Sequence, residues 1–266
     1  MTTRETARFA RRTLAELTIE DEASFRHVAL YADLAEVLRR DGYSFRVLPE
    51  RDAGRWDRAL LLNLTFWGAS EGGDVLVDET VPADVVAHVA WHRLASNALP
   101  TAPGAKPSAD ALFLGEAIAS AFDLYLVGRL LGHSPDSTFL ATQVPAMADA
   151  ALEAGCDEAT FDALLEDVAR EPEEAFEDLR ALLVDATTAL FACATAEQAL
   201  VALDRLGGHR FAPLLHRYEL SNWVLYARAY GDAEPDARAR AVESALREAD
   251  DAVAWLEEAW LRPALT

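Results

Sequence analysis

The spacing of apolar residues changes along the chain and predicts helices first. Over residues 2–17 and 21–40, apolar side chains recur every three or four positions, which is the period of an amphipathic helix. Gly42 follows the second stretch, and glycine readily adopts the left-handed conformation that ends many helices. The sequence therefore predicts two helices at the start of the chain.

Short runs rich in Val, Leu, Phe and Tyr come next. They cover residues 43–48, 59–67 and 74–78, and segments rich in turn-forming residues separate them. Runs of this length and composition between turns are typical of β-strands. We predict three strands of one small sheet.

Two further helices are predicted on either side of a proline-rich break. Thr80 and Pro82 favour a helix start, because threonine caps helices and proline suits the first turn. This helix continues to about Ala98. Residues 99–108 contain three prolines and one glycine, which predicts a loop. The next helix covers residues 108–131 and is strongly apolar.

Nearly all of the remaining chain has helical periodicity, without a fixed repeat. Helices are predicted over residues 137–154, 158–169, 172–191, 196–206, 211–230 and 235–261. We therefore expect an α+β, predominantly helical fold. Residues 1–131 would form an α+β part with a small sheet beside the helix that begins near Pro82. Residues 132–266 would form a helical bundle packed on it as one compact unit.

The composition indicates a globular protein with a large excess of acidic residues. The 266 residues include 45 Asp and Glu against 24 Lys and Arg, which gives a net charge of -21. Such a charge repels nucleic acid and anionic membranes, so neither is an expected partner. No uninterrupted apolar run reaches the roughly 18 residues of a membrane span. We expect a cytoplasmic protein.

Two histidines and one glutamate form the main candidate site. His88 and His92 are four residues apart on a predicted helix, so both rings lie on one face. Glu116 follows on the next helix and can supply a third ligand. Two histidines and a carboxylate leave coordination positions open for water or substrate. This trio predicts a site for a divalent metal, zinc first and iron as the alternative.

The order of these residues resembles one branch of the zincin metallopeptidases. In gluzincins a helix with the motif HExxH and a downstream glutamate hold zinc, and the matching stretches here are His88-Val89-Ala90-Trp91-His92 and Gly115-Glu116-Ala117. The resemblance implies a zincin-like fold over about residues 43–131. The family's catalytic glutamate is replaced by Val89. The resemblance therefore implies a non-peptidase relative or a metal-assisted enzyme of altered chemistry, with ordinary peptidase activity not expected.

Five polar residues are candidates for supporting roles near the metal or the substrate. Asp84 lies one turn before His88, although its simpler role is to complement the positive end of the helix. Asp123 lies two turns after the glutamate and can orient a ligand histidine. His216, Tyr218 and Glu219 form a polar cluster in a later helix, and the resemblance implies that such a cluster can stabilise a reaction intermediate.

A metal-free interpretation accounts for the same residues. The two histidines would then be half-buried side chains packed near Trp91 and Phe113, and Glu116 would pair with Arg93 or Arg129. The protein would be an acidic helical interaction module that binds a protein partner through its second half. The metal-binding interpretation instead predicts a small-molecule or peptide ligand.

Overall fold

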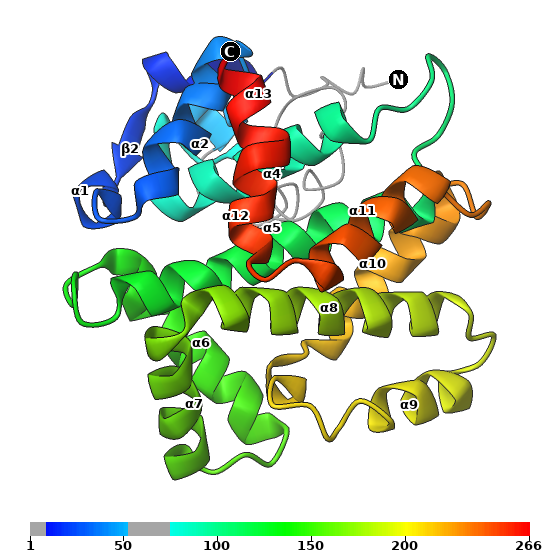
Figure 1. The fold of residues 1–266 in the computed structure, drawn as a ribbon. Helices are drawn as coiled ribbons and strands as arrows, with labels where there is room; N and C mark the ends of the chain where they lie inside the picture. Colours follow the sequence, from blue (N-terminus) through cyan, green and yellow to red (C-terminus); the bar gives the residue numbers. More distant parts are fainter. Residues whose placement is uncertain (1–8, 53–74) are drawn as a thin grey trace.

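The computed structural model describes residues 9–52 and 75–266 and is predominantly helical, with two small sheets (Figure 1). The expected fold class is confirmed. The longer helices are α2 (Ala29–Arg40), α4 (Ala83–Ala98), α5 (Ala109–Leu130), α6 (Thr138–Glu153), α7 (Glu158–Arg170), α8 (Pro172–Phe191), α9 (Ala196–Asp204), α10 (Arg217–Tyr230) and α11 (Ala237–Glu248).

Two short sheets lie in the first part of the chain. In the three-stranded sheet, β3 (Ser44–Val47) lies between antiparallel β1 (Ala10–Thr13) and parallel β4 (Val75–Leu76). In the second sheet, β2 (Thr18–Glu20) pairs in parallel with β5 (Thr80–Pro82). The strands predicted over 43–48 and 74–78 are thus confirmed. The strand predicted over 59–67 lies outside the described residues.

The helix predicted over residues 2–17 is wrong where the structure describes it. Residues 10–13 form β1, whose backbone pairs with β3 from Ala10 opposite Val47 to Thr13 opposite Ser44. A single 3-10 turn (Leu14–Glu16) follows, and Thr13 and Glu16 hydrogen-bond to each other at its start. Pairing with a distant strand outweighs local helical periodicity here, because periodicity carries no information about distant partners.

Two other predicted helices are interrupted or begin later than expected. The stretch 21–40 contains a short α1 (Glu22–Phe25) and then α2. Helix α1 begins directly after Asp21, which has a positive φ of 61° and accepts a hydrogen bond from Ser137 Oγ at 2.7 Å. Thr80 lies in β5 rather than capping a helix, and α4 begins at Ala83.

The last two predicted helices are also divided. Residues 211–230 form a 3-10 turn (Ala212–Leu214) and then α10, which His216 caps. Residues 235–261 form α11 and α12 (Ala252–Leu256), followed by a π-helical turn (Glu257–Leu261). A final short helix, α13 (Arg262–Leu265), lies against α2. Capping residues in the interior of each stretch end the first element and begin the next.

Helix α5 forms the centre of the fold. It packs most extensively against α8 and α4, and it also contacts α6, α7, α10 and α11. By length and hydropathy, α5 alone among the described helices passes a test for a membrane span, with a mean hydropathy of 1.5. However, 78% of that apolar window is buried by the other helices. Its apolar character is accounted for by contacts with protein on all sides.

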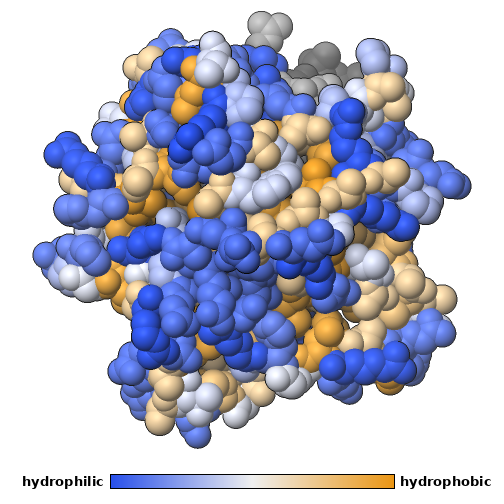
Figure 2. Space-filling view, viewed as in Figure 1, coloured by the Kyte–Doolittle hydropathy of each residue, from blue (hydrophilic) through white to orange (hydrophobic). Residues whose placement is uncertain are grey.

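One hydrophobic core extends through both predicted parts of the chain. Buried side chains from α2 and α4 belong to the same cluster as those from α8 and α12. Hydrophilic residues cover most of the outer face shown in Figure 2, and apolar residues emerge mainly as patches between helices. The division at residue 131 stays a prediction.

Gly128 allows α5 to approach the α7–α8 corner closely. A Cβ atom there would lie 2.5 Å from the carbonyl oxygen of Val168 and 3.0 Å from Pro172 Cβ. We predict that Gly128→Ala lowers the free energy of unfolding by about 1–3 kcal/mol, because the backbones must separate. Gly115→Ala on the same helix is the control. Its Cβ would lie 3.5 Å from Ala95 Cβ, an ordinary contact. Urea unfolding curves measure both, and equal stability of the two variants would contradict the prediction.

Candidate metal site

Helix α4 presents both histidines on the face that packs toward α5. It begins directly after β5, which fixes its first turn, and His88 and His92 then lie one helical turn apart. Their side chains are 16% and 14% exposed. Both rings are therefore largely buried and still accessible to a small ion or ligand.

Small residues bring α4 and α5 close together beside these histidines. Ala95 lies one turn after His92, and it faces Gly115, which immediately precedes Glu116. Further along the interface, the rings of Trp91 and Phe122 pack edge to face with centroids 5.3 Å apart. Because Gly115 lies against Ala95, the residue that follows it, Glu116, lies within reach of His92.

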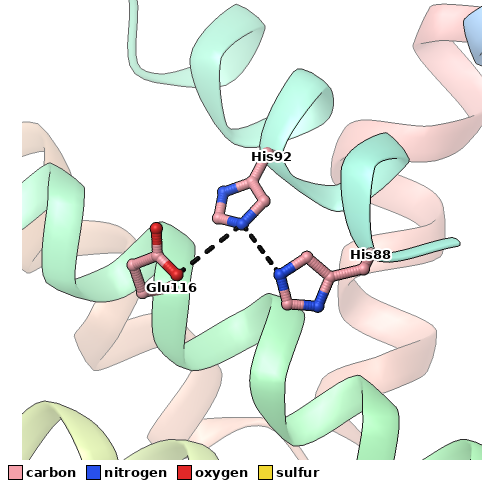
Figure 3. Close-up of side chains that lie close together, drawn as sticks. All are labelled: His88, His92 and Glu116. Carbon is pink, nitrogen blue, oxygen red and sulfur yellow. Dashed lines mark hydrogen bonds and ion pairs between the residues drawn. The ribbon is translucent and has the colours of Figure 1, made fainter. Parts of the chain in front are cut away.

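The three predicted ligands converge on one point (Figure 3). The Nε2 atoms of His88 and His92 are 3.1 Å apart, and His92 Nε2 lies 3.7 Å from Glu116 Oε2. One donor atom from each residue lies within 4.8 Å of the others. Two donors that each bind zinc at about 2.0 Å in tetrahedral geometry are about 3.3 Å apart. The group could therefore hold a metal ion with only small side-chain movements.

Asp123 orients the first of these histidines. Its Oδ2 atom lies 3.0 Å from His88 Nδ1, and a carboxylate at this distance accepts the Nδ1 hydrogen. In the neutral ring the lone pair is then on Nε2, the atom that faces His92 and Glu116. The carboxylate thus sets the tautomer that metal binding requires.

The environment also keeps His92 neutral. Burial, and to a smaller extent the nearby His88, holds the pKa of His92 well below its usual range. Without an ion, the 3.1 Å contact between the Nε2 atoms needs one hydrogen between them. An ion held at this point would take the place of that hydrogen and accept a lone pair from each ring.

The arginines considered as partners of Glu116 are engaged elsewhere. Arg93 Nε lies 2.5 Å from Asp41 Oδ2, and Arg129 forms an ion pair with Glu173. The Glu116 side chain is only 5% exposed and faces His92 instead. Neither Arg93 nor Arg129 therefore forms the ion pair with Glu116 that the metal-free interpretation expects.

Asp84 lies in the first turn of α4 and is half-buried. Burial and, to a smaller extent, the charge of Asp123 raise the pKa of Asp84 to about 6. Hydrogen bonds from the first backbone N–H groups of the helix and the charge of His88 oppose this rise. Asp84 is therefore electrostatically coupled to the site. No hydrogen bond links it to the three candidate ligands among the contacts described.

The cluster predicted in the later helix is only partly near the site. Glu219 and His216 line a cavity of about 160 Å³ together with Asp123. Desolvation raises the pKa of Glu219, while His216 and His88 oppose the shift. Tyr218 is 73% exposed and lines neither this cavity nor the one beside His92.

Sequence reasoning missed two tyrosines of α10. Tyr226 and Tyr230 line a second cavity of about 230 Å³, to which His92 and Glu116 also contribute. The two tyrosines are four residues apart, a spacing that predicts a shared helix face. Nothing in the sequence connects that face with a helix more than one hundred residues earlier.

Comparisons with known proteins add no family assignment. No protein-family model, no curated protein and no solved structure matches the chain. The kinship with zincins therefore stays a prediction.

The pKa of Asp84 generates a prediction for the metal-free protein. Because its carboxyl has a higher pKa in the folded chain than in the unfolded chain, the folded state binds the proton more tightly. The contribution of Asp84 to the free energy of unfolding should fall, by about 1–2 kcal/mol, as the pH rises from about 4 to about 6. Asp84→Asn should remove this part of the pH dependence.

Urea unfolding in the presence of a chelator, at several pH values, measures the effect. Asp162→Asn, at an exposed position of α7, is the matched control and should leave the pH profile unchanged. An identical profile for wild type and Asp84→Asn would contradict the prediction.

Proposed function

We propose that this protein binds a divalent transition metal, zinc in first place, through His88, His92 and Glu116. The proposal rests on one observation: donor atoms from two adjacent helices lie within 4.8 Å of one another at a largely buried point. Two imidazoles and a carboxylate are the donor set of many catalytic zinc sites. The same set holds iron(II) in some oxygenases, but zinc binds more tightly to a given site of this kind.

The surrounding charges support a cation at this point. Asp123 lies next to His88, and the carboxyls of Asp84 and Glu219 both have raised pKa values that Asp123 helps to raise. A positive ion at the histidines would offset the repulsion among these carboxylates. The group therefore suits a cation better than an anionic ligand alone.

The proposed chemistry is metal-assisted and differs from that of the HExxH peptidases. Three protein ligands leave a coordination position open, where a divalent ion can polarise a substrate or lower the pKa of water. The position of the peptidase base is taken by Val89, which is 4% exposed and belongs to the hydrophobic core. We therefore propose a zincin-like arrangement of ligands without ordinary peptidase activity.

Metal content is the direct test. Protein purified without an affinity tag should contain close to one equivalent of metal, with zinc the main ion by mass spectrometry. His88→Ala and Glu116→Ala should lose it, since two ligands hold zinc much more weakly than three. His133→Ala replaces a histidine that lies near His27 instead, and its metal content should match the wild type.

The opposite outcome would support the acidic interaction module. A protein that takes up no zinc, iron or other divalent ion and has the same melting temperature with and without a chelator would overturn the proposal. A stabilising ion should raise the melting temperature, because it binds the folded state selectively.

Asp123 provides a second, quantitative prediction. Asp123→Ala should weaken zinc binding by about tenfold to a hundredfold, because His88 loses the acceptor that sets its tautomer. Competition with a chromophoric chelator measures the dissociation constant. Asp110→Ala changes an aspartate at the start of the same helix that pairs with Arg240, and it should leave the constant unchanged. Equal affinity of Asp123→Ala and wild type would exclude the orienting role.

A further inference from the structure

The cavity beside His92 and Glu116 is lined mainly by uncharged side chains. It measures about 230 Å³ and lies between α4, the loop 99–108, α5 and α10. Its apolar lining includes Leu99, Pro107 and Leu112. Among the described residues that line it, only His92 and Glu116 carry an imidazole or a carboxyl group. The cavity thus combines an uncharged wall with two candidate metal ligands.

Hydrogen bonds hold the walls of this cavity in place. The N–H of Asp232 donates to the carbonyl of Pro107, and the N–H of Ala109 donates to the carbonyl of Asp232, both at 2.8 Å. These bonds attach the end of the loop to the segment that follows α10. At Gly231, directly after α10, a Cβ would lie 3.3 Å from Leu112 Cδ1 of α5. The end of α10 therefore packs tightly on α5, and the cavity is formed before any ligand arrives.

Two aromatic rings form one side of the cavity. The centroids of Tyr226 and Tyr230 are 4.9 Å apart, and their planes are inclined by 41°. Tyr230 is 61% exposed, so its ring remains available to a ligand. Tyrosine rings offer apolar surface together with a polar tip, which suits the entrance of a ligand site.

The size and lining of the cavity limit what can occupy it. An apolar cavity of about 150 Å³ holds a benzene molecule, so the volume here accommodates one aromatic ring or a branched aliphatic group with a short connection. A charged group would lose hydration against uncharged walls without gaining a partner. The polar end of a ligand must therefore lie at His92 and Glu116.

We infer that the metal centre takes a ligand in two parts: a polar head that coordinates the ion, and an uncharged aromatic or aliphatic group seated between α4, α5 and α10. The inference rests on the proposed metal site and adds the class of ligand. A second cavity, of about 160 Å³, carries Asp123, Glu219 and His216 beside apolar residues such as Leu124 and Trp223. The cavity of about 230 Å³ is larger, and the candidate ligands His92 and Glu116 line it directly.

Two hydroxamates test this inference on zinc-loaded protein. Acetohydroxamate and benzohydroxamate share the metal-binding head and differ in a methyl against a phenyl group. Isothermal titration should show that benzohydroxamate binds at least about tenfold more tightly, because its ring is buried in the cavity. Equal affinities would overturn the inference while leaving the metal site intact.

Substitutions in the cavity wall test whether the phenyl group of benzohydroxamate binds in this cavity. Tyr230→Ala should reduce the affinity for benzohydroxamate about fivefold and leave that for acetohydroxamate unchanged. Tyr218→Ala, at a similarly exposed tyrosine of the same helix outside the cavity, should change neither. Ala111→Leu narrows the cavity from α5 and should also reduce the preference for the phenyl group. A preference that survives both Tyr230→Ala and Ala111→Leu would place the ring elsewhere and overturn the inference.

The test also separates failure of the inference from failure of the metal proposal. If no zinc binds to the wild type, the proposed function is overturned and the inference falls with it. If zinc and acetohydroxamate both bind but the phenyl group adds no affinity, only the inference is overturned.

Discussion

The close packing of α4 on α5 is the contact on which the candidate site depends. Ala95 and Gly115 leave space for the helices to approach, and Trp91 and Phe122 fill the interface one or two turns away. Small residues at a helix contact fix the distance between backbones, because the helices meet without long side chains between them. Glu116 follows Gly115 directly, so the same contact that builds the core brings a carboxylate to His92.

Carboxylates that repel one another also surround the candidate site. Asp123 contacts His88, and the charge of His88 also acts on Asp84 and Glu219, while the buried His92 resists taking up a proton. A cation held at these residues would offset the repulsion among the carboxylates. The cavity that His92 and Glu116 line with mainly uncharged residues gives the site a second, contrasting environment.

The structure agrees with the sequence most closely where an element is long and strongly patterned. Helices α4, α5, α7 and α8 lie within a few residues of their predicted bounds, because long runs of helix-forming residues between breaks at proline, glycine or capping residues determine them locally. The predictions from sequence are wrong where hydrogen bonds to distant segments of the chain determine the local structure. Residues 10–13 join a strand, and Asp21 begins a turn because its carboxylate binds the start of α6. Such pairings leave no periodic signal.

The sequence by itself determined the helical character of the chain, the spacing of His88 and His92 on one face, and Glu116 as the candidate third ligand. These features follow from the 3.6-residue helical period and from residue chemistry. Only the tertiary structure decided that Glu116 faces His92, that Asp123 meets His88 Nδ1, and that Tyr226 and Tyr230 close a cavity beside them. The rotation of each helix about its axis and its distance from its neighbours depend on packing across the whole core, which local sequence does not encode.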